Sequence, residues 1–162
     1  MIRVVYTLAG SAILLGAAFL WGCERTSKEK KKLSIIGELN SLVRYIESHI
    51  RNFRTPLFDI YEQYSSKELM KCGFIETMRA DGFLAAVSKV EGILPVETVD
   101  HLKKFGKMIG NGYEKEQSEL CLFLSEQLLA KEKKLYGELP KKVKMYRLLP
   151  VLLAVTVIIL LL

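Results

Sequence analysis

Apolar residues recur every three or four positions through most of the middle of this chain. Between residues 33 and 53 the apolar positions are Leu33, Ile36, Leu39, Val43, Ile46, Ile50 and Phe53. An α-helix repeats every 3.6 residues, so this spacing predicts one helix with a single apolar stripe. No segment alternates between apolar and polar residues over the length of a strand. The chain is therefore predicted to be all-α.

Capping residues predict three shorter helices after residue 53. Thr55 is a favourable N-cap and Pro56 suits a first helical position, so a second helix is expected to follow them. Ser65 and Glu68 have the spacing of a capping box and predict a third helix as far as residue 80. An Asp-Gly pair at 81–82 then breaks the chain before a fourth helix over 83–90.

Two longer helices are expected to complete the middle region. Pro95 starts one that ends at Gly110. Asn111 and Glu114 fit an N-cap and its reciprocal partner for the other, which extends to about residue 136. A glycine at 137 and a proline at 140 are expected to interrupt the helix there. The fold predicted for the middle region is a bundle of about six helices, an even number that brings the chain back to the side it left.

Two charge-free apolar runs flank the bundle. The run from Val4 to Cys23 is long enough, at about 1.5 Å per residue, to cross the roughly 30 Å hydrocarbon core of a bilayer as a helix. The run from Leu148 to Leu162 is shorter, and Lys144 and Arg147 can extend to the interface beside it. Both runs are predicted to be transmembrane helices, with a buried soluble helix as the alternative for the second.

The composition first suggests a nucleic acid or an anionic membrane as partner, because the 162 residues carry a formal charge of +6 and the pI is about 9.2. Residues 33–138, however, hold 14 basic and 16 acidic residues, a net charge of −2. The excess lies at Arg3 and in segments 24–32 and 139–147. The basic residues of these segments are Arg25, Lys28, Lys30, Lys31, Lys32, Lys141, Lys142, Lys144 and Arg147. By the positive-inside rule these segments predict a membrane hairpin with a cytoplasmic middle region, and no nucleic-acid partner.

One alternative concerns the end of the first apolar run. Leu20, Trp21, Gly22 and Cys23 resemble a bacterial lipoprotein cleavage site. Trp21 is bulky where a small residue is usual, and export would place the basic segments on the outer side of the membrane. An uncleaved anchor is therefore the favoured interpretation, with a lipid on Cys23 as the alternative.

Residues that carry out catalysis or bind metals are sparse. His49 and His101 have no partner at a metal-ligand spacing, and the three cysteines form no CxxC pair. No glycine-rich phosphate loop is present. We therefore expect no enzymatic activity, metal or cofactor. One small basic face, formed by Lys103, Lys104 and Lys107, is either a solvated helix face, which is the favoured interpretation, or a candidate surface for an acidic partner.

The order of motifs resembles the stage III sporulation protein AB family of endospore-forming bacteria. The resemblance covers essentially the whole chain and rests on RTPL at 54–57, FGKMIG at 105–110, a glutamine soon after, and a basic run before the terminal apolar segment. The matching positions are Arg54, Thr55, Pro56, Leu57, Phe105, Gly106, Gly110 and Gln117. The chain departs from the pattern at His49, Tyr113 and Pro150.

This resemblance implies a function and a division of the chain. Members are similar to the platform proteins of type II secretion and type IV pilus machines. The implied role is a non-enzymatic platform in the mother-cell membrane around the forespore, which couples a secretion-type cytoplasmic ATPase to other stage III sporulation proteins. A further copy of the chain itself is a candidate partner. The parts would be spans at 1–23 and 148–162, basic segments at 24–32 and 139–147, and a cytoplasmic domain at 33–138. The alternative is a regulatory membrane protein whose helical bundle senses a ligand.

Overall fold

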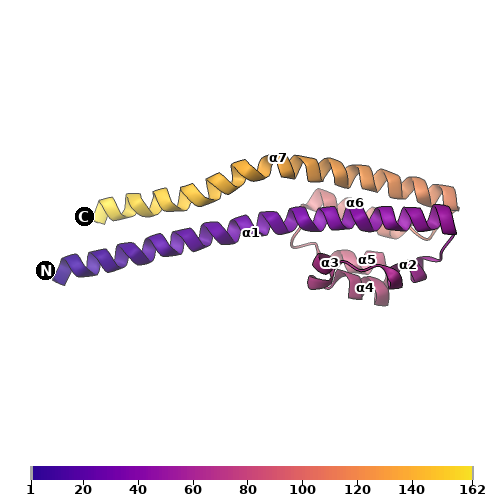
Figure 1. Ribbon diagram of the computed structural model, residues 1–162, viewed down its shortest axis with the longest axis horizontal. Helices are drawn as coiled ribbons and strands as arrows, with labels where there is room; N and C mark the ends of the chain where they lie inside the picture. The colour runs from indigo at the N-terminus through magenta and orange to yellow at the C-terminus, as the bar shows by residue number, and fades with distance from the viewer. Residues whose placement is uncertain (1, 162) are drawn as a thin grey trace. The chain divides into compact units, whose positions relative to one another are not determined.

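In the computed structural model the chain is all-helical, as its apolar spacing predicts (Figure 1). The structure describes the backbone of residues 2–161 and the side chains of residues 10, 13 and 15–159. Over this range it has seven α-helices and one short 3-10 helix, and no strand. The two longest helices are α1 (Ile2–Phe53) and α7 (Glu114–Leu161).

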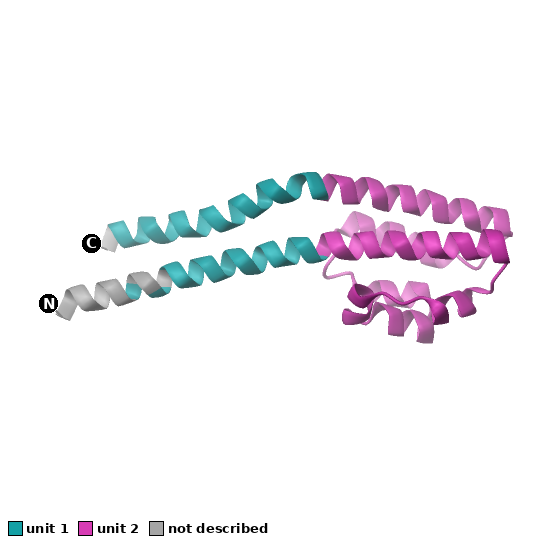
Figure 2. Cartoon of the chain, in the orientation of Figure 1, with its two compact units in different colours: residues 1–31, 136–162 teal, residues 32–135 magenta. Residues whose placement is uncertain are grey.

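The chain forms two compact units (Figure 2). Unit 1 consists of residues 1–31 and 136–162, and unit 2 consists of residues 32–135. Helices α1 and α7 contribute to both units, because each passes a unit boundary without a break. All the shorter helices belong to unit 2.

Helix α1 is continuous through residues 24–32, so the first apolar run and the first amphipathic stripe share one helix. Thr26 does not cap a new helix; its hydroxyl donates a 2.9 Å hydrogen bond to the Gly22 carbonyl one turn earlier. The apolar stripe is buried at most positions from Ile36 to Ile50. The expectation for Phe53 was wrong: its ring is 68% exposed, because α1 ends at this residue and no other helix covers it.

The segment after α1 is divided more finely than predicted. It contains α2 (Leu57–Gln63), α3 (Lys67–Lys71), α4 (Phe74–Asp81), α5 (Phe83–Ala86) and the 3-10 helix η1 (Val87–Lys89). The expected third helix is split into α3 and α4 because Gly73 takes a left-handed φ of 75°. Ser66, one residue later than predicted, is the N-cap of α3, and its hydroxyl accepts the Leu69 N–H.

Helix α6 (Val96–Met108) starts directly after Pro95, as expected. The predicted cap of the next helix was wrong. The Asn111 side chain donates to the Lys107 carbonyl and so closes α6, whereas Glu116 accepts the Tyr113 N–H at the start of α7. The predicted interruption at residues 137 and 140 was also wrong, because α7 continues through both and through Pro150. A helix that is already formed on both sides of a proline tolerates the loss of the one backbone hydrogen bond that the proline cannot donate.

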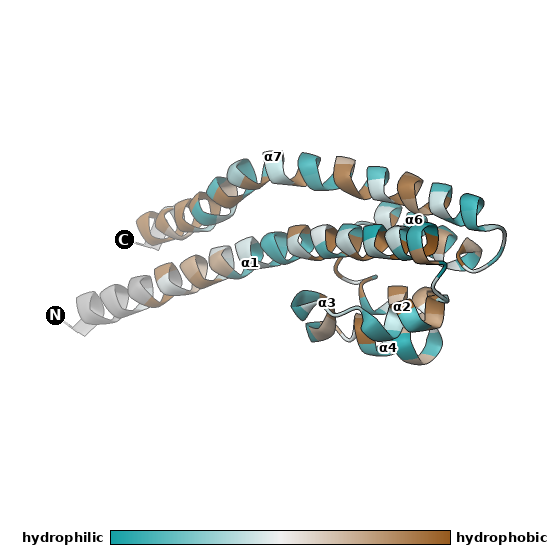
Figure 3. Cartoon of the chain, turned by 45° about the vertical axis from the view of Figure 1, so that its right-hand side comes forward, coloured by the Kyte–Doolittle hydropathy of each residue, from teal (hydrophilic) through white to brown (hydrophobic). Residues whose placement is uncertain are grey.

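The core of unit 2 is formed by the apolar faces of α1 and α7 together with the short helices that connect them in the sequence (Figure 3). Phe83 lies at its centre, edge-on to Phe74 at 5.6 Å and to Phe105 at 4.9 Å. Leu84, the residue after Phe83, is exposed although it is apolar. Ile35 and Leu42 are fully buried although neither belongs to the predicted stripe, because α1 is covered from more than one side.

Across the residues that the structure describes, we find no helical stretch that is both long and apolar enough to cross a membrane. The two predicted spans are therefore not confirmed by these helices. Both predictions fall partly outside the described residues, since the side chains of residues 1–9, 11, 12, 14 and 160–162 are not described.

Candidate docking site

Six of the eight motif positions meet at one pocket of unit 2. The pocket has a volume of about 390 Å³ and lies where α1 turns into α2 and where α6 turns into α7. Its lining residues are Ile50, Arg54, Thr55, Pro56, Leu57, Gly110, Glu114 and Gln117. Three stretches that are far apart in the sequence thus form one concave surface.

The first wall is the turn over residues 54–57. Arg54 adopts a φ of 52°, a left-handed value that is unusual for a residue with a side chain. Its N–H donates to the Ile50 carbonyl at 3.2 Å, and the N–H of Thr55 donates to the His49 carbonyl at 3.3 Å. Pro56 holds the preceding residue away from helical backbone angles, so α2 begins in a new direction.

The second wall is the loop over residues 109–113, which Gln117 fastens to α7. The side-chain oxygen of Gln117 accepts the Gly110 N–H at 3.3 Å, and its side-chain nitrogen donates to the Gly112 carbonyl at 2.9 Å. Gly110 has a φ of 88°, and a Cβ placed on it would lie 3.1 Å from Leu57 Cδ1. Glycine therefore permits both the backbone conformation of the loop and its contact with the opposite wall.

Charge across the pocket is balanced by one ion pair. Arg54 Nε lies 3.0 Å from Glu114 Oε2 and joins the turn after α1 to the first turn of α7. The Arg54 side chain is 83% exposed, so this pair contributes little to folding and remains available to a partner. The pocket therefore combines the apolar side chains of Ile50 and Leu57 with an arginine, a carboxylate and an amide.

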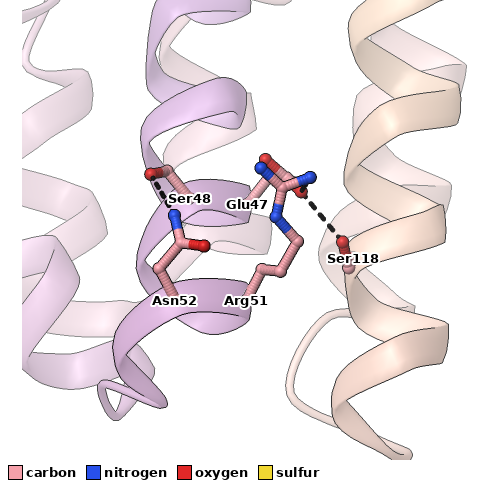
Figure 4. Close-up of polar contacts among 5 residues, drawn as sticks. All are labelled: Glu47, Ser48, Arg51, Asn52 and Ser118. Atoms are coloured by element: carbon pink, nitrogen blue, oxygen red, sulfur yellow. Dashed lines mark hydrogen bonds and ion pairs between the residues drawn. The ribbon is translucent and has the colours of Figure 1, made fainter.

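A buried polar contact joins α1 and α7 beside the pocket (Figure 4). Glu47 accepts a 3.0 Å hydrogen bond from the Ser118 hydroxyl and pairs with Arg51 at 3.1 Å. Asn52 donates to the Ser48 hydroxyl on the neighbouring face of α1. Burial, and secondarily the Glu47 carboxylate, raises the pKa of the Cys121 thiol to about 12, so that thiol stays neutral.

The remaining two motif positions, Phe105 and Gly106, lie outside the pocket. Phe105 is buried against Phe83 in the core. A Cβ on Gly106 would lie 2.9 Å from the Leu84 Cα, so glycine permits close packing of α6 on α5. These two residues position α6, and with it the loop that contains Gly110.

The predicted basic face on α6 is less uniform than its sequence suggests. Lys103 pairs with Glu91 at 2.8 Å, and this hydrogen bond raises the pKa of Lys103. Lys104 and Lys107 are exposed and form no ion pair with any other described residue. Only those two remain fully available to an acidic partner.

The basic segments of unit 1 contain ordered ion pairs. Lys28 lies 2.7 Å from Glu24 and, through that hydrogen bond, lowers the pKa of the Glu24 carboxyl. Lys142 lies 2.9 Å from Glu138 and 3.6 Å from Glu29, so it bridges α7 and α1 within the unit. The other basic residues of these segments described in unit 1 are Arg25, Lys30, Lys31, Lys141, Lys144 and Arg147, all of them exposed. Lys32, the last residue of the first segment, is half-buried in unit 2.

The three departures from the family pattern occupy different environments. His49 is half-buried between Tyr45 and Phe53, at ring distances of 4.2 and 5.4 Å, and its Nδ1 has no hydrogen-bond partner. Tyr113 is exposed at the start of α7, and Pro150 is buried within α7. Within the described part of the chain no group of His, Cys, Asp or Glu is arranged to hold a metal ion.

Sequence reasoning missed two residues of the pocket. Ile50 was assigned to the core stripe and Glu114 to a helix cap, and neither was linked to Arg54. A signal existed, since Arg54 and Glu114 carry opposite charges and each stands beside a predicted chain break. The sequence contains no indication that the two breaks lie together in space.

Comparison with known proteins identifies a family. A family model described as stage III sporulation protein AB (spore_III_AB) matches residues 80–162, just over half of the chain. The matched range includes four motif positions, Phe105, Gly106, Gly110 and Gln117, whereas the turn at residues 54–57 lies before it. Neither the curated proteins nor the solved structures contain a match.

Proposed function

Because the chain belongs to the stage III sporulation protein AB family and so has a role in stage III of sporulation, we propose that it acts there as a non-enzymatic membrane platform. In this proposal the protein lies in the mother-cell membrane around the forespore. Unit 2 faces the cytoplasm and docks a secretion-type ATPase, and the apolar ends of the chain hold it in an assembly with other stage III sporulation proteins.

The observation that carries the docking proposal is the convergence of the motif residues on one pocket. Ile50 and Leu57 contribute apolar surface to the pocket, and the Arg54 side chain that also lines it is largely exposed. A partner that inserts one apolar side chain would be anchored in the way that protein interfaces are usually anchored, with a small buried contact inside a polar rim.

Membrane attachment is supported by the chain ends. The two apolar runs lie in segments that belong to unit 1, and the adjoining basic residues belong largely to the same unit. A hairpin with its basic residues on the cytoplasmic side accounts for both features. Labelling of a cysteine introduced at residue 162 tests it: reagent applied from outside should reach this cysteine, and labelling only from the cytoplasm would contradict the hairpin.

Coupling to the membrane would pass along the two long helices. The pocket lies at the C-terminal end of α1 and at the N-terminal end of α7, and each helix extends without interruption into unit 1. Helix α1 contains no proline, so its backbone hydrogen bonds resist local bending between the pocket and unit 1 and allow it to transmit a displacement. Nucleotide-driven movement of a docked ATPase would thus be passed towards the membrane.

The docking proposal is tested with the full chain in lipid nanodiscs and the purified secretion-type sporulation ATPase. Arg54→Ala should weaken association at least tenfold, within the range for an interface hot spot. Arg44→Ala is the matched control, because Arg44 is exposed on α1 in the same unit but does not line the pocket.

Two results would contradict this proposal in different ways. If the wild-type chain does not bind the ATPase, the coupling role is wrong. If it binds and Arg54→Ala, Leu57→Ala and Gln117→Ala all bind equally well, docking uses another surface. Spore counts of strains with the same substitutions should fall in the same order as the affinities.

Ligand sensing is a second candidate function, because a pocket of about 390 Å³ falls within the size range of small-molecule sites. Native mass spectrometry of protein purified from sporulating cells separates the two candidates. A stoichiometric small molecule on the wild type that is lost in Arg54→Ala would favour sensing, and a bare protein would favour docking.

A further inference from the structure

The two basic segments are more than 100 residues apart in the sequence, yet residues 24–31 and 139–147 lie side by side within unit 1 (Figure 2). A Cβ placed on Gly22 would lie 2.5 Å from the Tyr146 carbonyl oxygen, so α1 and α7 approach backbone to backbone there. Two turns further along α1, Glu29 pairs with Lys142 at 3.6 Å. The segments therefore form one basic zone around the helix pair.

The acidic residues of this zone are engaged by internal partners. Glu24 pairs with Lys28, and Glu138 and Glu29 both pair with Lys142. The Arg25 guanidinium lies over the Trp21 ring, and five further basic residues are exposed and form no ion pair with any residue described in the structure. We call them the basic belt: Lys30, Lys31, Lys141, Lys144 and Arg147. Their charge is left for a partner outside the chain.

The partner must also accommodate apolar surface, because the basic zone borders directly on the two charge-free runs. Trp21 is half-exposed at this border, with the Arg25 guanidinium 5.3 Å from the centre of its ring. A tryptophan with a cation beside it is characteristic of a helix at the membrane interface. A nucleic acid or an acidic protein would satisfy the charge but not the apolar border.

We infer that the basic belt binds the phosphate headgroups of anionic lipids, so that the helix pair gathers such lipids around itself. The inference rests on the membrane attachment proposed above and adds a lipid preference to it. Clusters of four to eight lysines and arginines beside a membrane helix attract anionic lipids by about 1 kcal/mol per residue near the surface. Lys142 is not part of the belt, since its ammonium group is already paired inside the unit.

The single tryptophan of the chain provides the measurement. The full-length protein is reconstituted into phosphatidylcholine vesicles that contain phosphatidylglycerol, and one lipid at a time carries brominated acyl chains, which quench Trp21 on contact. Brominated phosphatidylglycerol should quench more strongly than brominated phosphatidylcholine at equal mole fraction. A relative binding constant of about five is expected, which corresponds to about 1 kcal/mol, and 1 M salt should bring it close to one.

Two variants make the test specific. Neutralising four belt residues together (K30Q, K31Q, K141Q and K144Q) should reduce the relative binding constant to nearly one. Neutralising four lysines of unit 2 (K103Q, K104Q, K107Q and K115Q) removes the same charge and should leave it unchanged. Circular dichroism of each variant verifies that its helix content is retained.

The outcomes distinguish this inference from the proposal on which it rests. Equal quenching by the two brominated lipids in the wild type would overturn the lipid preference while leaving membrane attachment intact. Absence of quenching by either lipid would mean that Trp21 does not reach the bilayer, and would count against the membrane attachment itself. An equal loss of preference in both quadruple variants would show a general charge effect and overturn the basic belt as a site.

Discussion

Ser125 on α7 donates a 2.7 Å hydrogen bond from its hydroxyl to Oδ1 of Asn40 on α1, and both side chains are buried. Seven residues away on each helix, Glu47 and Ser118 form the second buried polar contact between the same two helices. An α-helix makes about two turns in seven residues, so both contacts lie on one seam of the antiparallel pair. Both contacts can form in only one register of α7 against α1, because a slip of α7 along α1 would leave each polar group unpaired inside the core.

Removing the Ser125 hydroxyl should therefore destabilise unit 2. Ser125→Ala leaves the Asn40 side chain buried without this partner, and we expect a loss of about 1–3 kcal/mol in the free energy of unfolding. Urea titration of the full chain in detergent micelles, followed by circular dichroism, measures the loss. Ser41→Ala is the control, because its hydroxyl is exposed and bonds only to the Gly37 carbonyl of the same helix. A similar free energy for both variants would contradict the importance of this contact.

The thiol of Cys121 should be unreactive in the folded protein. Burial raises its pKa to about 12, whereas the reacting species is the thiolate. At pH 8 we expect maleimide to modify the half-buried Cys72 before Cys121, and urea to expose Cys121 to the reagent. Mass spectrometry of peptides after timed labelling gives the order. Equal rates in the native protein would show that this part of the core opens readily.

Much of the fold follows from local sequence signals. The apolar stripe of α1 and the start of α6 after Pro95 agree with the structure because they depend on spacing and capping within a single helix. The errors lie where tertiary contacts compete with local preferences. Pro140 should end a helix on its own, yet α7 continues through it. Ile35 is buried outside the predicted stripe because other helices cover that side of α1.

The candidate site was predictable only as separate pieces. The residues of the 54–57 turn and Gly110 were selected from the sequence through a family resemblance, and Thr55 and Gly110 also as helix boundaries. Their meeting at one pocket depends on the register of α1 against α7, which buried contacts such as Asn40 with Ser125 determine. Those contacts are between polar residues more than 70 positions apart, and a periodicity analysis of one sequence does not detect them.

Two glycines with positive φ help to separate backbone strain from a role of the pocket. Gly110 and Gly82 have φ values of 88° and 87°, and the ψ of Gly82 is 174°, so alanine is strained at either position and should cost about 1–3 kcal/mol. A Cβ on Gly82 would have no neighbour within 4 Å, whereas a Cβ on Gly110 would press on Leu57 in the pocket. We expect both variants to be destabilised. Only Gly110→Ala should lose more affinity for the ATPase than its destabilisation alone explains. Equal affinities in the two variants would remove the loop at 109–113 from the docking site.

Gly22 should be required for the close approach of α1 and α7 in unit 1. A Cβ there would lie 2.5 Å from a main-chain oxygen, which cannot rotate away, so Gly22→Ala must separate the helices locally. Gly16→Ala is the control, because a Cβ at Gly16 has no neighbour within 4 Å and alanine favours a helix. Hydrogen exchange followed by mass spectrometry should show faster exchange around Gly22 and Tyr146 in the first variant alone. Unchanged exchange in Gly22→Ala would contradict the backbone contact.

Stability should fall with rising pH between about 10 and 12. Burial is the main cause that raises the pKa of Tyr61 and Tyr64 from 10 to about 12. Across this interval the unfolded chain has already released those phenolic protons and the folded chain still holds them, so an increase in pH favours unfolding. The contribution is fully present below pH 10 and is lost as the pH passes 12.

Chemical denaturation at pH 9 and pH 11 measures this fall in the free energy of unfolding. Absorbance at 295 nm should show that some of the seven tyrosines of the chain lose their protons only at a higher pH than the others. Tyr64→Phe should reduce the fall, whereas Tyr136→Phe should not, because that ring is 70% exposed. An equal reduction in both variants would mean that burial is not the cause.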